Sequence, residues 1–532
     1  MEDFLYAQVA GRLESLIRKG LLKTGDKLAS VRALSKEQGI SMSTAYKAYS
    51  ELEQRGFIEA RTKSGYYVRY SRRAIPDTPE PVDKASGTAL GATSGGTLGV
   101  TPGVTSGATP GTPSGTLSGT AKKAADMAPG AAKKPDASWQ NTSDLVDKVL
   151  PRFATDATVV RFSMAAPSLE LLPRARLSKM MAEALRRDPT GCLGYDQLQG
   201  NALLRQQIAL QAFRWNGSVK PDDIVTTHGC TEAVTLCLMA VTQPGDTVVL
   251  ETPTFYGLIR SVRNLGLNVL EIPGNPQTGI DIDYLEKALA KAKEGESRIG
   301  AGIFIPNFSN PLGACMPDKN KIRLVQLLEK ENIPLIEDDI YGDLHFDQAR
   351  PRTCKSWDKT GNVLLCSSMS KSLAPGYRVG WCIPGKYLDK VLALKRIHGV
   401  ASTYPTHAAI GLFLANNRFD LHMRHLRKAL HTQSLQYIQA IAKYFPKDTR
   451  VTQPRGGYVL WVEMNRAVHA FTLFQSAIEE KISISPGPLF SMDERYGHCM
   501  RLSFGQTFTP EVDRALRTLG RLVHQAQSIE KK

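Results

Sequence analysis

The stretch Ser-Met-Ser-Lys-Ser-Leu-Ala-Pro-Gly-Tyr-Arg-Val-Gly, residues 368–380, decides the fold and much of the chemistry of this 532-residue chain. Its lysine, Lys371, follows the apolar run Val363–Cys366, which is typical of a buried strand, and Arg378 comes seven residues later. A lysine held away from water beside another cation has a lowered pKa, and its neutral amine can form a Schiff base with an aldehyde. A lone lysine is more often a surface charge, so other segments have to support this interpretation.

Strand-like and helical segments alternate on both sides of this stretch. Apolar runs typical of strands lie at 224–226, 246–251, 299–305, 333–336 and 363–366, and helical patterns follow Glu232 and cover 318–332. This alternation predicts an α/β domain with a largely parallel sheet. Because ligands of such sheets bind beyond the carboxyl ends of the strands, candidate site residues are expected there.

Asp338 follows the strand-like run at 333–336. A carboxylate in that place could pair with a protonated pyridine nitrogen and keep the ring electron-withdrawing. Residues 337–339 are all acidic, however, and helix starts are also enriched in acidic residues. Both interpretations stay open at this point.

Other residues with suitable chemistry follow neighbouring strands. Gly229-Cys230-Thr231 precedes a helical segment, whose first N–H groups can hold a phosphate. Tyr341 could bond a phenolate oxygen, and Asn310 lies on an Asn-Pro turn. Phe255 could stack on a flat ring, although most aromatic side chains are core residues.

Taken together, these residues stand in the order and spacing of a known group. Residues from about 160 to 525 resemble the fold-type I pyridoxal-phosphate enzymes of the class I aminotransferase group, whose α/β fold has a large and a small subdomain. The resemblance implies pyridoxal 5′-phosphate as cofactor, an internal aldimine at Lys371, a pairing of Asp338 with the pyridine nitrogen, and bonds from Tyr341 and Asn310 to the ring hydroxyl. It implies that the phosphate is held by Gly229, Cys230, Thr231, Ser368, Arg378 and, as a helper, Ser370.

The resemblance assigns four further residues. Phe255 would stack on the cofactor ring, and Tyr195 would reach a phosphate in the neighbouring subunit, which implies a homodimer. Arg501, in Cys-Met-Arg-Leu-Ser-Phe-Gly, would clamp a substrate α-carboxylate, which a guanidinium binds bidentately. The group usually has Gly-x-Pro where this chain has Ala165-Ala166-Pro167, so Ala165 adds a methyl group where the substrate would bind.

The first 75 residues predict three helices. Apolar residues repeat with helical spacing from Val9 to Ile17. Ser30 can cap a second helix over Val31–Gln38, and Ser41 or Ser43 can cap a third that runs to Arg55. Two β-type runs at 57–61 and 66–70 flank a Lys-Ser-Gly turn, which predicts a hairpin. Three helices followed by a hairpin indicate a winged helix-turn-helix, mainly α-helical with a β hairpin.

Residues from about 4 to 70 resemble the GntR-type winged-helix family, through Gly25–Leu34, Ser41–Ile58 and Arg61–Val68. This chain has Ala29 where the family usually has Pro, and Lys63 where it often has Gly. The third helix would enter the major groove of double-stranded DNA with its N-terminus first. Base-edge or phosphate contacts are expected from Ser30, Arg32, Ser43, Thr44, Lys47, Arg61 and Lys63. The alternative is a helical adaptor that never touches DNA.

Composition separates these two parts of the chain. From Ala85 to Ala121 there is no charged residue, and Gly recurs at every fourth position from Gly87 to Gly119. A segment this poor in large apolar groups is expected to be a flexible linker. We therefore expect a DNA-binding domain at 1–75, a Gly/Thr/Pro-rich linker at 76–143 and an aminotransferase-like domain at 144–532.

Charge and composition exclude several classes of protein. The net charge is +16, and residues 1–75 alone carry 14 Lys and Arg against 8 Asp and Glu, which fits a polyanion partner. No run reaches the roughly 18 apolar residues of a membrane span, and the N-terminus does not resemble a secretory signal. The eight cysteines show no zinc spacing, so no metal site is expected. We expect reduced thiols in a cytoplasmic protein.

A GntR-like module joined to an aminotransferase-like domain resembles the MocR regulator family along the whole chain. The resemblance implies a DNA-binding transcription regulator that senses pyridoxal phosphate, an amine or an amino acid through an aldimine at Lys371. The alternative is an active pyridoxal-phosphate-dependent aminotransferase with an accessory DNA-binding module. A scaffold that has lost both activities is disfavoured by the number of site residues present.

Overall fold

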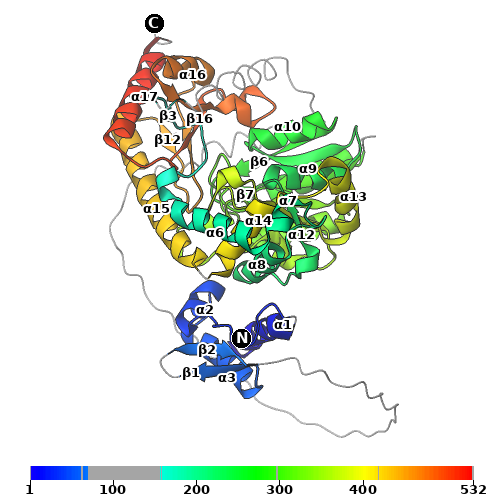
Figure 1. The fold of residues 1–532 in the computed structure, drawn as a ribbon. Coiled ribbons are helices and arrows are strands. Elements are labelled where there is room, and N and C mark those ends of the chain that lie inside the picture. Colours follow the sequence, from blue (N-terminus) through cyan, green and yellow to red (C-terminus); the bar gives the residue numbers. More distant parts are fainter. Residues whose placement is uncertain are drawn as a thin grey trace, which may run out of the picture.

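The structure, a computed structural model, describes residues 2–18, 20–61, 64–69, 156, 158–294, 298–416 and 418–529. In Figure 1 a small N-terminal module lies below a much larger unit, and the C-terminal helix lies at the opposite end. The expected linker at 76–143 and both of its boundaries lie outside the described residues.

The N-terminal module has the predicted three helices and hairpin. The helices are α1 (Glu2–Arg18), α2 (Val31–Gln38) and α3 (Met42–Gln54), and the antiparallel strands are β1 (Ile58–Arg61) and β2 (Gly65–Val68). Ser30 caps α2 by accepting a hydrogen bond from the Ala33 N–H at 3.1 Å, and Ser41, rather than Ser43, caps α3. The left-handed Gly39, with φ of 62°, ends α2. The winged helix-turn-helix is therefore confirmed.

The large subdomain is built on an eight-stranded sheet. Its strands, in spatial order, are β4 (Val225–Thr227), β11 (Gly380–Ile383), β10 (Val363–Ser368), β9 (Leu335–Asp338), β8 (Ile299–Phe304), β5 (Thr247–Thr252), β6 (Asn268–Asn275) and β7 (Gly279–Ile280). From β10 to β6 every neighbouring pair is parallel, whereas β11 and β7 run antiparallel to their neighbours. The expected largely parallel sheet is present.

Helices cover this sheet and bury its strands. They are α6 (Arg174–Arg187), α7 (Pro189–Leu193), α8 (Ala202–Ala212), α9 (Cys230–Val241), α10 (Tyr256–Asn264), α11 (Ile282–Ala292), α12 (Asp318–Lys330), α13 (Leu388–His398) and α14 (Tyr404–Ala415). Every residue of β5, β9 and β10 is buried, as expected for a sheet covered on both faces.

The small subdomain follows the long helix α15 (Phe419–Tyr444). Its antiparallel sheet has the order β12 (Arg450–Val451), β13 (Val459–Glu463), β16 (Cys499–Ser503) and β15 (Ser485–Pro486), and α16 (Ala470–Glu479) and α17 (Pro510–Ile529) pack beside it. The strand β3 (Val160–Arg161) pairs with β14 (Ile482–Ser483), so the beginning and the end of the aminotransferase-like part meet. The expected division into large and small subdomains is confirmed.

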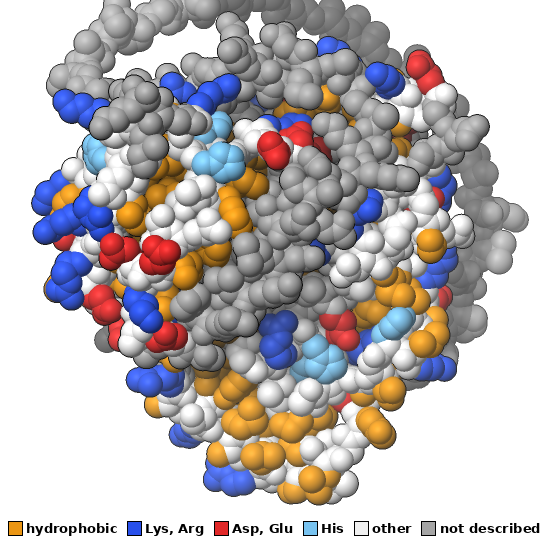
Figure 2. All heavy atoms as spheres, turned by 90° about the horizontal axis from the view of Figure 1, so that it is seen from above, with side chains coloured by type: hydrophobic (Ala, Val, Ile, Leu, Met, Phe, Trp, Pro, Cys, Tyr) orange, Lys and Arg blue, Asp and Glu red, His pale blue; other side chains and the backbone are white. Residues whose placement is uncertain are grey.

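On the face opposite the N-terminal module, the visible described residues carry cationic side chains in several separate places. Figure 2 shows Lys and Arg groups spread around the rim of that face, with hydrophobic groups gathered at its lower edge.

All eight cysteines are free, and six of them are buried. Among the described residues, no helix combines the length and the apolar character needed to cross a membrane.

The Tyr49 hydroxyl contacts Ala29, which stands where the resembling family usually has proline. The Tyr49 ring is 1% exposed, and its hydroxyl donates to the Ala29 carbonyl at 2.7 Å, which joins α3 to the segment before α2. A buried hydrogen bond of this kind contributes about 1 kcal/mol.

We expect Tyr49→Phe to lower the free energy of local opening of α2 and α3 by about 1 kcal/mol, because the Ala29 carbonyl loses its donor. Amide hydrogen exchange of residues 31–54 should become about fivefold faster. Tyr46→Phe is the matched control, because Tyr46 is 58% exposed. Equal exchange in both variants would contradict the expected role of the bond.

Candidate functional site

Lys371 projects from the loop between β10 and β11 into a cavity at the carboxyl ends of the strands. Its Nζ donates to the Ala165 carbonyl at 2.5 Å, and its own carbonyl accepts a hydrogen bond from the Tyr458 hydroxyl at 2.5 Å. The loop is therefore held from two directions. Burial lowers the pKa of Lys371 to about 8, helped by the positive charges of Arg501 and Arg378, while Asp338 acts in the opposite direction.

Asp338 is the last residue of β9, so the alternative interpretation of residues 337–339 as a helix start is wrong. Its Oδ1 accepts hydrogen bonds from the Ile340 N–H at 3.1 Å and from the Cys230 thiol at 3.4 Å. Burial raises the pKa of Asp338 to about 6. A cationic N–H donor next to this carboxylate would lower that pKa, because it would favour the ionised form.

An anion cradle lies between the start of α9 and the 368–378 segment. The N–H groups at the start of α9 follow Gly229, whose φ is +90°, and a Cβ at this position would lie 2.3 Å from Arg378 Nη2. Arg378 donates to the Ser370 hydroxyl at 3.2 Å and to the His228 carbonyl at 3.1 Å. Oriented N–H groups at a helix start beside a guanidinium are suited to hold a phosphate.

Arg501 is a buried guanidinium on β16 of the small subdomain, with 2% exposure. Its Nη2 donates to the Ser163 carbonyl and to the Ser485 hydroxyl, the latter at 2.6 Å, while its Nε has no hydrogen-bond partner. Phe490 lies under the group at 5.7 Å. Burial lowers the pKa of Arg501. No ion pair with a carboxylate is found for it within the described residues, so a carboxylate ligand would supply the missing charge.

The remaining polar groups complete the cavity wall. Asn310 is 2% exposed, its Oδ1 lacks a partner, and its side chain forms a hydrogen bond that lowers the pKa of Tyr341, although burial raises that pKa overall. Phe255 packs against Tyr256, with ring centroids 4.9 Å apart. Asn310 therefore offers a buried acceptor to a ligand.

The structure brings nearly all the predicted cofactor and substrate residues together. One cavity of about 310 Å³ is lined by Ala165, Cys230, Thr231, Phe255, Asn310, Asp338, Tyr341, Ser368, Ser370, Lys371, Arg378 and Arg501. Gly229 lies directly behind Arg378. Tyr195 is not among the lining residues and is 89% exposed.

The sequence did not reveal several functional neighbours. Ser163, Met164 and Tyr256 line the same cavity, the Cys230 thiol contacts Asp338, and Tyr458 holds the lysine loop. Tyr256 directly follows Phe255, and Ser163 and Met164 directly precede Ala165, which could have indicated them. The Cys230–Asp338 and Tyr458–Lys371 contacts join residues 108 and 87 positions apart, and no local pattern marks them.

The predicted DNA-contact residues divide into three groups. Ser30, Arg32, Ser43, Lys47 and Arg61 are exposed. Thr44 is buried, with its hydroxyl 2.7 Å from that of Ser41, so it lies outside the exposed face of α3. Lys63 lies outside the described residues. The exposed face of α3 also carries Met42 and Tyr46.

Among the described residues, no group of His, Cys, Asp and Glu could hold a metal ion.

Comparison with known families matches both parts of the chain. Residues 158–519 match the family described as aminotransferase class I and II, and residues 5–68 match the bacterial regulatory proteins of the gntR family. The HTH-type transcriptional regulator YjiR of Escherichia coli (strain K12) is 32% identical over 98% of this chain and 99% of its own length. The regulator YdcR of the same organism is 31% identical over 98% and 99% of the two chains.

A solved structure of the same fold carries a ligand. The α-aminoadipate aminotransferase LysN of Thermus thermophilus, complexed with N-(5′-phosphopyridoxyl)-L-leucine, has 26% sequence identity and a TM-score of 0.65. The alignment covers 73% of this chain and 99% of that one.

The pKa of Lys371 predicts its reactivity in the cofactor-free protein. Below pH about 8 the amine is protonated and inert, whereas above it the amine is neutral and can attack an aldehyde. We expect reductive methylation with formaldehyde and cyanoborohydride, followed by peptide mass spectrometry, to show a midpoint near pH 8 at Lys371. An unperturbed lysine would show a midpoint near about 10.4. Lys371→Arg is the control for site assignment, and a midpoint at the unperturbed value would contradict the geometry.

Proposed function

The chain belongs to the aminotransferase class I and II family and carries a gntR-family DNA-binding domain at its N-terminus, in the MocR-like architecture. From that premise we propose that it is a transcription regulator. Its large domain would sense pyridoxal 5′-phosphate, or an amine or amino acid that reacts with this cofactor. The observation that carries this proposal is the presence in one chain of a DNA-binding module and a cavity that holds Lys371, Asp338, Arg378 and Arg501.

The cavity residues fit pyridoxal phosphate. Asp338 is a buried carboxylate with a raised pKa, and Asn310 has an unpartnered buried oxygen. The Arg378 guanidinium can lie against Gly229 only because that residue has no Cβ. When bound, the cofactor supplies an aldehyde and an electron-withdrawing ring. Lys371 would carry the aldehyde, Asp338 would hold the ring nitrogen and Phe255 would stack on the ring. The phosphate would lie on the N–H groups of Cys230 and Thr231, Ser368, Ser370 and Arg378, and Tyr341 and Asn310 would hold the ring hydroxyl.

Arg501 favours an effector with a carboxylate. The guanidinium is buried, its Nε is unpartnered, and it faces the same cavity as Lys371. An amino acid could bind with its carboxylate on Arg501 and its amine toward Lys371. Ala165 and Met164 line the same cavity. The Thermus enzyme was solved with N-(5′-phosphopyridoxyl)-L-leucine, a compound in which an amino acid is joined to the phosphopyridoxyl group.

A homodimer is the proposed assembly. The large side chains of Leu193, Tyr195 and Ile397 are 92%, 89% and 77% exposed. Lys395 of α13 donates to the Leu198 carbonyl at 2.5 Å, so the segment that carries Tyr195 lies beside the end of α13. A second copy would cover this surface and could bring Tyr195 to the partner's phosphate.

DNA binding by the N-terminal module would use the exposed residues of α2, α3 and the wing. Ser30 and Arg32 would hold phosphates, Ser43 and Lys47 lie at the start of α3, and Arg61 lies on the wing, stacked on Tyr67 at 4.4 Å. Because Figure 1 places α3 and the hairpin on the side of the module away from the large domain, this face is accessible to DNA.

The second candidate function is transamination, and the completeness of the cavity favours it. Lys371, Asp338, Tyr341 and Arg501 all line one space, as an active aminotransferase would require. Release of a 2-oxo acid from an amino acid, with turnover, would support it. An effector that binds without turnover would support the regulator alone.

Pyridoxal phosphate is expected to change the DNA affinity of the full-length protein about fivefold or more, which is the lower end of typical coupling between sites. The measurement is a titration of DNA from the chain's own upstream region, at fixed salt and against competitor DNA. Lys371→Ala should bind DNA equally with and without the cofactor, whereas Lys390→Ala should behave as wild type. No preference over competitor in either state would contradict the proposed regulation of that locus.

Arg501→Ala should remove the preference for a carboxylate. We expect wild-type protein loaded with pyridoxal phosphate to bind L-alanine more tightly than ethylamine. The variant should lose about a hundredfold of that preference, or about 3 kcal/mol, because it loses a buried charged contact. The change in cofactor absorbance on titration measures both affinities. Arg514→Ala, an exposed arginine, is the control, and an unchanged preference in Arg501→Ala would show that the carboxylate lies elsewhere.

A further inference from the structure

The DNA-binding module contacts the large domain through α2. Gln38 Nε2 donates to the Phe213 carbonyl at 3.1 Å, and Phe213 lies in the single turn Phe213–Trp215 after α8. The Phe213 ring is 8% exposed and belongs to the same buried apolar cluster as Leu34 and Tyr49 of the module. One aromatic residue of the large domain thus completes the core of the small one. We call this contact the α2 seam, made by residues 33–38 on one side and by Phe213, Arg214, Asp420 and Arg427 on the other.

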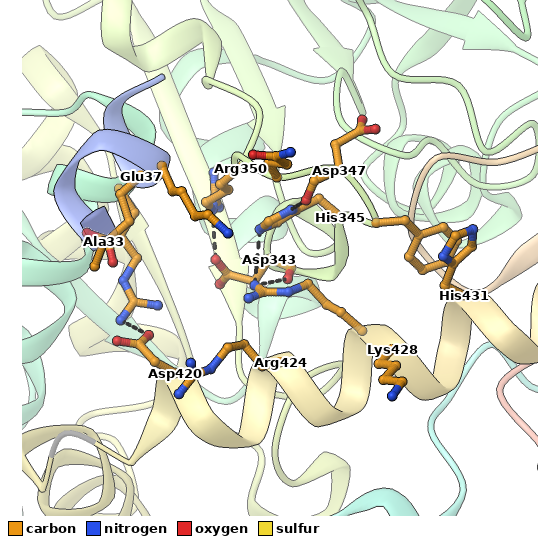
Figure 3. Close-up of a pocket in the computed structure, with 15 residues that line it drawn as sticks. Ala33, Glu37, Asp343, His345, Asp347, Arg350, Asp420, Arg424, Lys428 and His431 are labelled. Carbon is orange, nitrogen blue, oxygen red and sulfur yellow. Dashed lines mark hydrogen bonds and ion pairs between the residues drawn. The ribbon is translucent and has the colours of Figure 1, made fainter. Parts of the chain in front are cut away.

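Charged groups on both sides of the α2 seam complement each other. Burial raises the pKa of Glu37, and the positive charges of Arg214 and Arg427 on the large domain act in the opposite direction. Arg214 forms an ion pair with Asp420 at the start of α15. Figure 3 shows the cavity at this seam, with Ala33 and Glu37 on α2, Asp420, Arg424, Lys428 and His431 on α15, and Asp343, His345 and Asp347 on the loop between them.

One loop forms a wall of both cavities. Asp338, Ile340 and Tyr341 line the cofactor cavity, whereas residues 343 and 345–348 line the cavity at the α2 seam, which has a volume of about 570 Å³. The loop therefore separates the two spaces with fewer than a dozen residues. A displacement of the first residues of this loop, in the cofactor cavity, would therefore be transmitted over only a few residues to the α2 seam.

Arg350 makes this loop rigid. Its side chain is 8% exposed and forms ion pairs with Asp339 at 2.5 Å and with Asp343 at 2.7 Å. Gly342 permits this close approach, because a Cβ there would lie 2.5 Å from Asp339 Oδ1 and 2.7 Å from Arg350 Nη2. A buried, doubly paired guanidinium resists rearrangement, since breaking either pair leaves an uncompensated charge. One side chain therefore links Asp339, the residue after Asp338, to Asp343.

The loop is in turn joined to α15. Arg427 donates to the Asp343 carbonyl at 3.3 Å and to His345 Nε2 at 3.0 Å, and the same guanidinium acts on Glu37. At its other end α15 packs against α17 of the small subdomain, the subdomain that also carries Arg501. Hydrogen bonds and ion pairs thus connect Asp339, which directly follows Asp338, through Arg350 and Asp343 to Arg427. Arg427 and Glu37 of the DNA-binding module line the same cavity at the α2 seam.

We propose that this loop and the α2 seam couple the cofactor cavity to the placement of the DNA-binding module. The inference deepens the proposed function, on which it rests, by naming the route of regulation. A ring nitrogen bound to Asp338 would change the position of the 338–350 loop, and Arg350 and Arg427 would pass that change to α2. The alternative is a purely structural role, in which the same ion pairs only hold the DNA-binding module against the large domain. The two alternatives differ in whether breaking the seam changes the response to the cofactor.

The test compares the cofactor response of four full-length proteins. The ratio of DNA affinities with and without pyridoxal phosphate is measured for wild type, Glu37→Lys, Asp343→Asn and Glu511→Lys. Glu37→Lys reverses the charge at the α2 seam, and Asp343→Asn removes the negative charge of one of the two partners of Arg350. Neither residue lines the cofactor cavity. Glu511→Lys makes the same charge change at an exposed residue of α17, a helix of the small subdomain that lies away from the N-terminal module in Figure 1.

We expect a ratio of about fivefold or more in wild type and in Glu511→Lys, and a ratio below about twofold in the two seam variants. Cofactor absorbance and cofactor-free DNA binding show that both parts of each variant are folded. The reciprocal measurement, cofactor affinity with and without DNA, must show the same ratios, because coupling between two binding sites is symmetric. Amide exchange of residues 31–38 should be faster in Glu37→Lys, which reports the loosened contact directly.

Two results would overturn the inference, and they are distinguishable. A wild-type protein whose DNA affinity ignores pyridoxal phosphate overturns both the proposed function and the coupling route. A wild-type protein that responds, with Glu37→Lys and Asp343→Asn responding by the same factor, overturns the route alone. Gln38→Ala gives a milder test of the seam, since it removes only the hydrogen bond to Phe213 and leaves the charges unchanged.

Discussion

The structure depends on keeping charged groups out of water at one edge of a sheet. Lys371, Asp338 and Arg501 all line one cavity, and no ion pair joins any two of them among the described residues. Burial lowers the pKa of Lys371, raises that of Asp338 and lowers that of Arg501. Each group is therefore held in an environment that disfavours its charge. A ligand with an aldehyde, a ring nitrogen and a carboxylate would compensate all three together.

The fold makes this arrangement possible by supplying rigid supports. Asp338 and Ser368 end neighbouring parallel strands, and the lysine loop is held through the Tyr458 hydroxyl. Arg501 comes from the other subdomain, which is why the cavity lies at the junction of the two sheets. The buried Arg350, with two carboxylate partners, supports the strand end from below. The site thus needs the complete aminotransferase fold.

Interactions between residues close in sequence made many of the helices and strands predictable. Ser30 and Gly39 mark both ends of α2 because cap residues act within a few residues of each other, and apolar runs of β type marked five of the large-sheet strands. The acid-rich segment at 337–339 was ambiguous, because charge pattern alone does not separate a strand end from a helix start. Thr44 was expected on the DNA face, yet its hydroxyl turns inward to Ser41. The pattern at the start of a helix does not reveal which of several hydroxyls does the capping.

The support of the site could not be predicted, because its partners come from distant segments. Asp339 is bonded by Asn307, 32 residues away, and by Arg350, while Tyr458 lies 87 residues from the lysine that it holds. Such pairs form only once the sheet order exists, and no spacing rule connects them. The same holds for Phe213, which reads in sequence as an ordinary core residue of the large domain and completes the core of the small one.

The buried charges also set the scale on which a sensor of this kind can work. A ligand shifts the balance between two arrangements only by the difference in its affinity for them. A tenfold change in DNA affinity requires about 1.4 kcal/mol, whereas a buried charged contact is worth about 2 to 5 kcal/mol. A ligand group that pairs with the charge of Asp338 or Arg501 could therefore supply the required difference in affinity. Only part of the free energy of that contact would be needed. Under the proposed function, binding in the cavity would thus supply enough free energy to move the DNA-binding module, provided that the module contacts the loop that carries Asp338.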